Sequence, residues 1–279
     1  MKSAGTMAVE AQSPHLAQTP WVLAARSRAL RTIARDTVLE ALRGRWFWLA
    51  AAATLFVGAA GAFARSLALT ETHDVTVAFA APLSRLAGVL IVVLTTVASM
   101  VREKSEGTLL LALAAPVSRA SWLAGKALGF ALIATTTALL LALPVLAAAP
   151  ALASAAWTLS LALELILVAT VSMAIGRALG QIALAVSAAI AFYVLARLLH
   201  VVLLLAERAQ NYSELESLTP LVHLLRIVVP RLDLFTCTDW LLYSPPSWAN
   251  LGAVGLQWLL YTALALVAAV IDLRRAPLA

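Results

Sequence analysis

Charge is scarce in this sequence. Aspartate, glutamate, lysine and arginine together make up 12% of the 279 residues, whereas apolar residues make up 62%. A water-soluble domain usually carries about 25% charged and about 45–50% apolar residues. So few charges cannot cover a surface that faces water. The composition therefore predicts a protein whose main solvent is lipid.

Cysteine is almost absent, and the motifs of common enzymes are missing. Cys237 is the only cysteine, which excludes an internal disulfide, and no Cys/His cluster has the spacing of a metal site. The sequence has no HExxH or GxSxG motif and no GxxxxGK[ST] phosphate-binding loop, because Gly125-Lys126 is followed by Ala127. We expect no catalytic residue, no metal and no cofactor in this chain. Any work that it performs must draw energy from another protein.

The first residues lack an apolar segment. Residues 1–20 are polar and contain Pro14 and Pro20, so they do not resemble a cleavable signal peptide. We expect a flexible cytoplasmic N-terminus here. Insertion would begin with the first long apolar run, which starts at Trp46.

Long apolar runs dominate the rest of the chain. A membrane-spanning helix needs about 20 mainly apolar residues. Six stretches have this length, at about 46–64, 83–101, 127–149, 157–176, 181–205 and 250–271. The sequence predicts an all-α integral membrane protein with six transmembrane helices, whose membrane domain covers residues 46–279.

The positions of the basic residues predict sidedness. Lysine and arginine gather in the cytoplasmic segments of membrane proteins. With the N-terminus inside, 14 of the 20 basic residues are cytoplasmic: Lys2, Arg26, Arg28, Arg31, Arg35, Arg43, Arg45, Arg102, Lys104, Arg119, Lys126, Arg177, Arg274 and Arg275. Both termini are therefore expected in the cytoplasm. This distribution also explains the net charge of +6 without a nucleic-acid partner.

Residues 21–45 have helical periodicity but carry too many charges to span a membrane. On a helix, one arc is mainly apolar: Leu23, Leu30, Ile33, Ala34, Thr37, Val38 and Ala41. The other arc is charged, with two leucines interrupting it: Arg28, Arg31, Arg35, Asp36, Leu39, Glu40, Leu42 and Arg43. The pattern predicts an amphipathic interface helix. It either fixes only the topology or also contacts a cytoplasmic partner, through Arg28, Arg31, Arg35 and Glu40.

Two segments between the spans are informative. The outer segment 207–250 contains an apolar stretch, 218–229, that is too short to span, which is compatible with a re-entrant segment before the last span. The cytoplasmic segment between the second and third spans combines charges with a short apolar stretch that ends at a proline. We expect a coupling helix and its flanks here, a handle for a soluble partner, formed by Arg102, Glu103, Lys104, Glu106, Gly107, Thr108, Leu111, Leu113, Pro116 and Arg119.

Three short patches resemble the permeases of type-2 ABC exporters. The first lies in this cytoplasmic segment and consists of Glu106-Gly107-Thr108, Pro116-Val117-Ser118-Arg119 and Gly125-Lys126. The second precedes the first span, from Ile33 to Asp36 and from Leu42 to Trp46. The third runs from Val229 to Phe235 and is similar to the segment before the last span in permeases linked to multicopper-enzyme maturation.

The resemblance implies a function. The chain would be the membrane-spanning permease subunit of an exporter in the bacterial cytoplasmic (inner) membrane, moving a substrate by ATP hydrolysis in separate subunits. Two ATP-binding cassette subunits, which hold ATP and Mg, would dock on the cytoplasmic segment and the N-terminal helix. A second permease copy or a sister permease, and membrane lipid, are the other implied partners. A stand-alone channel or assembly factor without an ATPase is the alternative, and a membrane enzyme is a third hypothesis.

Two charged residues stand inside predicted spans. Glu164 lies about seven residues from the outer end of the fourth span, and Arg197 about eight from that of the fifth. A rise of about 1.5 Å per residue places both roughly 10–12 Å below the outer boundary. Charges at this depth are costly unless they are paired or face water. Three interpretations are open: a static clamp between two helices, a polar lining of a transport route, or an Arg197 that snorkels to the interface.

Overall fold

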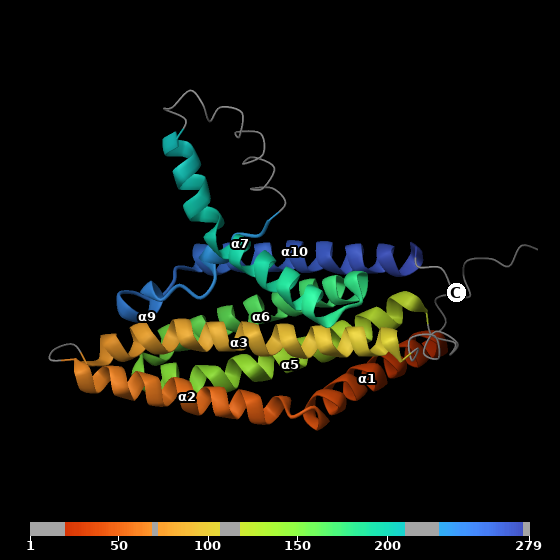
Figure 1. The fold of residues 1–279 in the computed structure, drawn as a ribbon, viewed down its shortest axis with the longest axis horizontal. Helices are drawn as coiled ribbons and strands as arrows, with labels where there is room; N and C mark the ends of the chain where they lie inside the picture. The colour runs from red at the N-terminus through yellow and green to blue at the C-terminus, as the bar shows by residue number, and fades with distance from the viewer. Residues whose placement is uncertain (1–19, 69–71, 107–117, 210–228, 276–279) are drawn as a thin grey trace, which may run out of the picture.

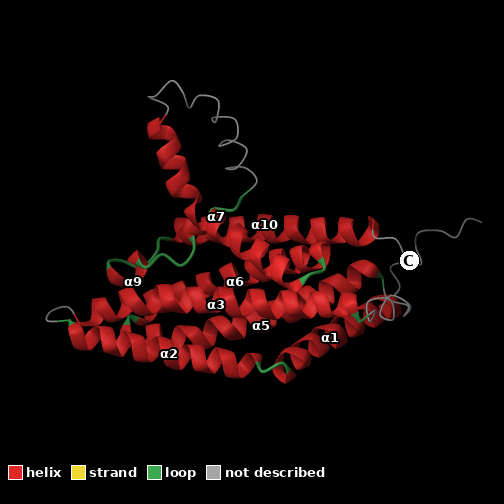
Figure 2. Ribbon diagram, viewed as in Figure 1, coloured by secondary structure: helices red, strands yellow, loops and turns green. Residues whose placement is uncertain are grey.

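The computed structural model describes residues 20–68, 72–106, 118–209 and 229–275 (Figure 1). These residues are almost entirely helical and contain no β-strand (Figure 2). Six helices are long and apolar enough to cross a membrane: α2 (Trp46–Leu67), α3 (Thr72–Ser105), α5 (Arg119–Ala148), α6 (Ala151–Leu179), α7 (Ile182–Ala209) and α10 (Trp248–Arg275). The chain is an all-α, multi-pass membrane protein, as the apolar runs predict.

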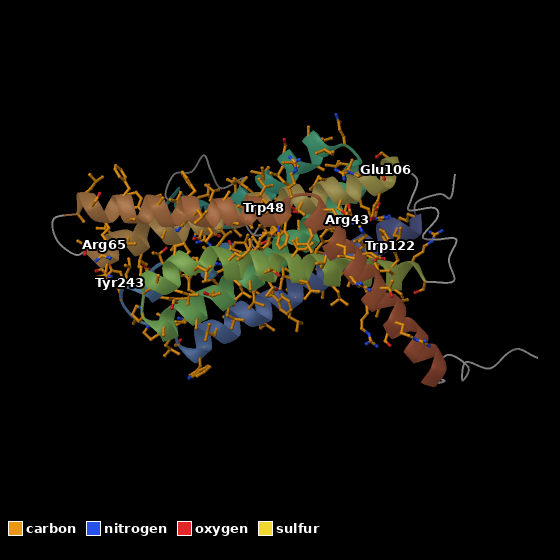
Figure 3. All side chains as sticks on the ribbon, turned by 90° about the horizontal axis from the view of Figure 1, so that it is seen from below. Arg43, Trp48, Arg65, Glu106, Trp122 and Tyr243 are labelled. Carbon is orange, nitrogen blue, oxygen red and sulfur yellow. The ribbon has the colours of Figure 1, made fainter. Side chains whose placement is uncertain are left out.

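The six helices alternate in direction and so define two ends of the bundle. The first, which we call the α1 end, carries helix α1 (Pro20–Arg43), the last turns of α3, α6 and α10, and the first turn of α5 (Figure 1). The second, the α9 end, carries the short helices η3 (Leu232–Leu234) and α9 (Asp239–Leu242). Figure 3 shows Arg65 and Tyr243 at the α9 end and Glu106 and Trp122 at the α1 end.

Helix α6 lies at the centre of the bundle. It packs against α3, α5, α7 and α10, and Trp157, Leu161 and Leu165 on it are fully buried. Helices α2, α7 and α10 lie at the periphery. More than half of each of the Leu256, Leu259 and Leu264 side chains on α10 is exposed. A helix with apolar residues on its exposed face needs lipid or another protein as its neighbour.

Three helices begin well before their predicted spans: α5 starts at Arg119 rather than at residue 127, and α3 and α6 also start early. Helix α3 starts at Thr72 rather than at residue 83, and it continues through Pro82. Helix α6 starts at Ala151 rather than at residue 157, directly after Pro150 as its N-cap. Proline often marks a helix boundary because it removes a backbone donor. In this bundle it is tolerated inside α3, and at α6 it stands just before the first turn, where the missing N–H would have no helical partner.

The apolar arc of α1 is covered by protein. Ala34, Thr37 and Ala41 are buried, and α1 packs on α5. Two glycines of α5 permit this close approach: a Cβ at Gly125 would lie 2.8 Å from the Cβ of Ile33, and one at Gly129 would lie 2.6 Å from that of Thr37. The helix has the predicted extent, but its periodicity reflects packing on α5. Leu39 and Leu42, which interrupt the charged arc, are exposed.

The segment before α10 folds back onto the bundle where it is described. Leu232 and Phe235 are fully buried, η3 contacts α7, and α9 contacts α6 and α3. Most of the stretch that suggested a re-entrant segment, residues 218–228, lies outside the described residues.

Candidate functional site

The expected coupling residues fall into two groups. Arg102, Glu103, Lys104 and Glu106 are at the end of α3, and Arg119 begins α5. Five further residues of this prediction lie outside the described residues: Gly107, Thr108, Leu111, Leu113 and Pro116. Arg102, Lys104 and Glu106 are exposed, and Glu103, Lys104 and Arg119 make contacts within the bundle.

Lys126 joins three helices at the α1 end. This nearly buried lysine of α5 forms ion pairs with Glu103 of α3 and with Glu40 of α1, the latter at 3.4 Å between Nζ and Oε2. The same Glu40 oxygen accepts a hydrogen bond from Ser99 of α3 at 3.1 Å. Only 19% of the Glu103 side chain is exposed. Glu103 therefore holds α3 to α5 and does not form an open contact surface.

Two basic side chains bind the C-terminal turns of other helices. Lys104 donates to the carbonyl oxygen of Arg177 on α6 at 3.2 Å, and Arg119 donates to that of Leu273 on α10 at 2.9 Å. Positive charge is favourable at a helix C-terminus, where carbonyl groups carry a partial negative charge. Arg177 also forms an ion pair with Asp272, which links α6 to α10.

These contacts form one set, which we call the α1-end network: Glu40, Glu103, Lys104, Arg119, Lys126, Arg177 and Asp272. It connects α3 and α5, the two helices that border segment 107–117, to α1, α6 and α10. A displacement of the ends of α3 and α5 would therefore be passed to three further helices. Within the described residues no group of three His, Cys, Asp or Glu could hold a metal ion.

A second polar cluster lies around Glu164, in the middle of α6. The side chain is completely buried, and its carboxylate has three partners. Tyr193 of α7 donates to Oε1 at 3.0 Å, Thr236 donates to Oε2 at 2.6 Å, and Arg197 Nη1 lies 3.7 Å from Oε1. The structure thus brings Glu164 and Arg197 together. Glu164 is deeper than expected, about 20 Å along α6 from its first residue at about 1.5 Å per residue.

Arg197 mainly holds the backbone of the outer segment. Its Nη1 donates to the carbonyl oxygens of Leu232 and Phe235, the latter at 2.9 Å. The backbone N–H of Thr236 donates to Ser160 Oγ at 3.0 Å, and Thr236 has a φ of 47°. That conformation is unfavourable for a β-branched residue, so the surrounding contacts must hold it. These contacts favour the clamp interpretation, in which Glu164 and Arg197 fix η3 to α6 and α7.

Sequence reasoning missed several members of both clusters. The sequence marks Arg177 only as a basic residue that indicates sidedness, and Lys126 as such a residue and as part of the first patch. It does not mark Asp272, Tyr193 or Thr236. Asp272 offered a signal, because it is the only acidic residue of α10 and lies beside the basic end of that helix. Thr236 offered none, since a threonine in an irregular segment has no distinguishing pattern.

Most of the charged side chains predicted to contact a partner from α1 are exposed. Arg28, Arg31 and Arg35 are exposed, and Glu40 belongs to the α1-end network.

No model of a known protein family matches the chain, and no curated protein sequence matches it. The family assignment therefore stays a prediction from the three short sequence patches.

Proposed function

We propose that this chain is the membrane-spanning permease subunit of a bacterial ABC exporter. The α1 end and both termini would lie in the cytoplasm, and ATP with its Mg would be held and hydrolysed by two separate subunits. The observation that carries this proposal is the α1-end network. A protein that converts work done by a cytoplasmic partner into movement of its spans needs its cytoplasmic helix ends joined in this way.

The partner would meet two elements. One is the segment between α3 and α5, which Arg102 and Glu106 border with exposed side chains. The other is the charged arc of α1, with Arg28, Arg31 and Arg35 exposed. Because α1 packs on α5 and Lys126 joins α1, α3 and α5, both elements would move as one body. Exposed charges at such a rim steer association, and apolar anchors at its centre contribute most of the binding energy.

The membrane surface of the chain also needs neighbours. The exposed apolar faces of α2, α7 and α10 would be covered by lipid and by a second permease copy or a sister permease. The transport route would then run between the two permeases.

Co-purification tests this proposal. The tagged chain, extracted from its own membranes in mild detergent, should bring with it a protein that contains a GxxxxGK[ST] loop. We expect one such protein per chain if the second permease is a copy of this chain, and two per chain if it is a sister permease. Leu111→Asp and Leu113→Asp should abolish this association, because a charge would be buried without a partner. Glu106→Ala should preserve assembly and lower ATP turnover.

The matched control is Leu152→Asp, an exposed leucine in the first turn of α6 at the α9 end. It introduces the same charge where a helix N-terminus tolerates it and should leave the association intact. Recovery of the chain without an ATP-binding protein under conditions that preserve the membrane complex would favour the stand-alone channel or assembly factor instead.

A further inference from the structure

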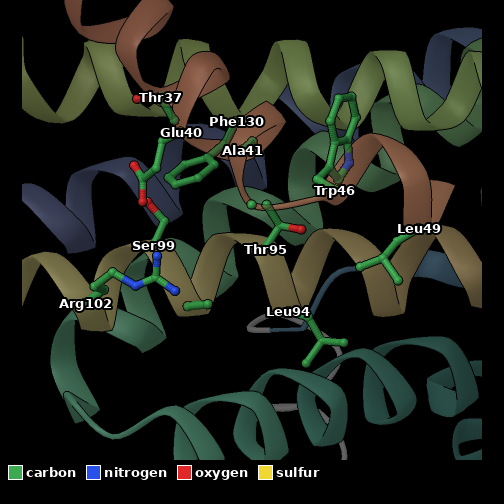
Figure 4. A pocket seen from close by; sticks show the side chains of 12 residues that line it. Thr37, Glu40, Ala41, Trp46, Leu49, Leu94, Thr95, Ser99, Arg102 and Phe130 are labelled. Atoms are coloured by element: carbon green, nitrogen blue, oxygen red, sulfur yellow. The ribbon is translucent and has the colours of Figure 1, made fainter.

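A hollow lies where α1 turns into α2. Helices α1 and α3 both pack on α5, and Phe130 of α5 forms part of the floor between them. The cavity measures about 180 Å³, and Figure 4 shows its side chains. Glu40, Ser99 and Arg102 line one part of it, and Leu49 and Leu94 line the other. We call this hollow the elbow groove.

The groove lies at the depth of a lipid headgroup. Helix α2 has 22 residues and is therefore about 33 Å long, close to the roughly 30 Å hydrocarbon thickness of a bilayer. Its first residues, Trp46, Phe47 and Trp48, are aromatic, as is common at a membrane boundary. Glu40 and Arg102 must therefore lie beyond that boundary. Leu49 and Leu94 lie just within the hydrocarbon, and both are about half exposed.

Charges of both signs border the polar part. A neighbouring hollow of about 460 Å³ shares Glu40, Gly44 and Arg102 with the groove and adds Asp36, Leu39 and Arg43. Two carboxylates and two guanidinium groups therefore line these two adjoining hollows. The contacts of Glu40 with Ser99 and Lys126 both use Oε2, and 35% of its side chain stays exposed. This lining matches a headgroup that carries one negative and one positive charge.

We propose that the elbow groove binds one glycerophospholipid with a primary-amine headgroup. The phosphate binds Arg102 and Arg43, where guanidinium groups supply paired donors. The ammonium group lies against Glu40 and Asp36, and the start of an acyl chain lies between Leu49 and Leu94. The bound lipid contacts α1, α2 and α3 at once and so holds the angle of the elbow. This site does not depend on the ATP-binding partner.

Native mass spectrometry of the delipidated full chain tests the site. The protein is titrated with phosphatidylethanolamine and, separately, with phosphatidylglycerol of the same acyl chains. We expect one phosphatidylethanolamine per chain at saturation and at least tenfold weaker binding of phosphatidylglycerol. Ala98→Phe fills the groove, since Ala98 is part of its lining, and should weaken phosphatidylethanolamine binding at least tenfold. Leu90→Phe, on an exposed part of α3 outside the lining, should bind as the unchanged protein does.

A second pair of variants covers the case in which Ala98→Phe does not fold. Arg43→Gln with Arg102→Gln removes the proposed phosphate partners, and Arg35→Gln is the control on the exposed arc of α1. The double variant should lose binding and the control should keep it. Unchanged lipid binding in a folded Ala98→Phe protein or in the double variant overturns the site. Equal binding of phosphatidylglycerol overturns the amine headgroup.

Discussion

Glu164 shows how a membrane helix accommodates one buried charge. Its carboxylate accepts hydrogen bonds from Tyr193 and Thr236 and lies near Arg197, which itself binds two backbone carbonyl groups of the outer segment. The sequence singled out Glu164 and Arg197 because charges are rare in apolar runs. It could not identify Thr236, which is 72 residues from Glu164, because that contact exists only after the segment folds back.

Removing one charge of this pair should be worse than removing both. Glu164→Leu leaves Arg197 without its counter-charge, and Arg197→Leu leaves Glu164 and two carbonyl groups short of donors. Breaking a buried pair from one side typically costs about 3–5 kcal/mol. We expect each single variant to unfold at lower temperature in detergent, and the double leucine variant to be less affected than either single variant.

Glu164→Gln serves as the control for this cycle, because its amide oxygen can still accept from Tyr193 or Thr236. It should retain more stability than Glu164→Leu. Strictly additive losses in the double variant would show that the two residues do not act as a pair.

Cys237 should react slowly with thiol reagents. Burial raises the pKa of its thiol, the nearby Arg197 opposes this only in part, and Sγ donates to the carbonyl oxygen of Asp233 at 3.3 Å. The thiolate is the reactive form, so the rate of maleimide modification rises with pH as the thiol ionises. For Cys237 this rate should reach half its maximum at a pH above about 8.5, which is the ordinary pKa of a cysteine thiol. The comparison is Ser66→Cys in a Cys237→Ser background, an exposed position at the same end of the bundle. Identical pH profiles for the two thiols would contradict the buried environment.

At the scale of helices, the extent of α1 could be predicted but its neighbour could not. The same apolar arc suits lipid and protein, because both are apolar surroundings. The decisive feature is on α5, where Gly125 and Gly129 admit Ile33 and Thr37. Helix starts were also uncertain from sequence: Pro82 lies inside α3, although proline usually marks a boundary. The six apolar runs themselves were clear, since their length leaves few alternatives to spanning helices.

Gly129→Ala should loosen α1 from the bundle. The added Cβ would lie 2.6 Å from the Cβ of Thr37 and 3.0 Å from the carbonyl oxygen of Ala34, so the helices must separate. Overpacking of this kind typically costs about 1–3 kcal/mol. Limited proteolysis should cut α1 faster in this variant. Gly255→Ala is the matched control, because a Cβ there has no atom within 4 Å; equal proteolysis of the two variants would contradict the close packing.

For the whole molecule, the arrangement of charges at the α1 end is the main result. The positions of the basic residues predicted that most of them share one end of the spans, and the segment between α3 and α5 stood out in the sequence; that this end faces the cytoplasm stays a prediction. The sequence did not predict that Glu103, Lys104 and Arg119 face other helices, because ion pairs between helices depend on their relative rotation. The network joins five helices and gives the proposed ATP-driven subunits a rigid surface on which to act.

Hydrogen–deuterium exchange of the assembled complex tests this account most directly. The complex is measured without nucleotide and after trapping with ATP and vanadate. We expect nucleotide trapping to change deuterium uptake in α1 and in the first turns of α5, because the network connects them to the docking segment, and to leave the middle of α2 unchanged as an internal control. Uptake in α1 and α5 that is identical in the two states would contradict the claim that ATP-driven motion enters the membrane through the α1 end.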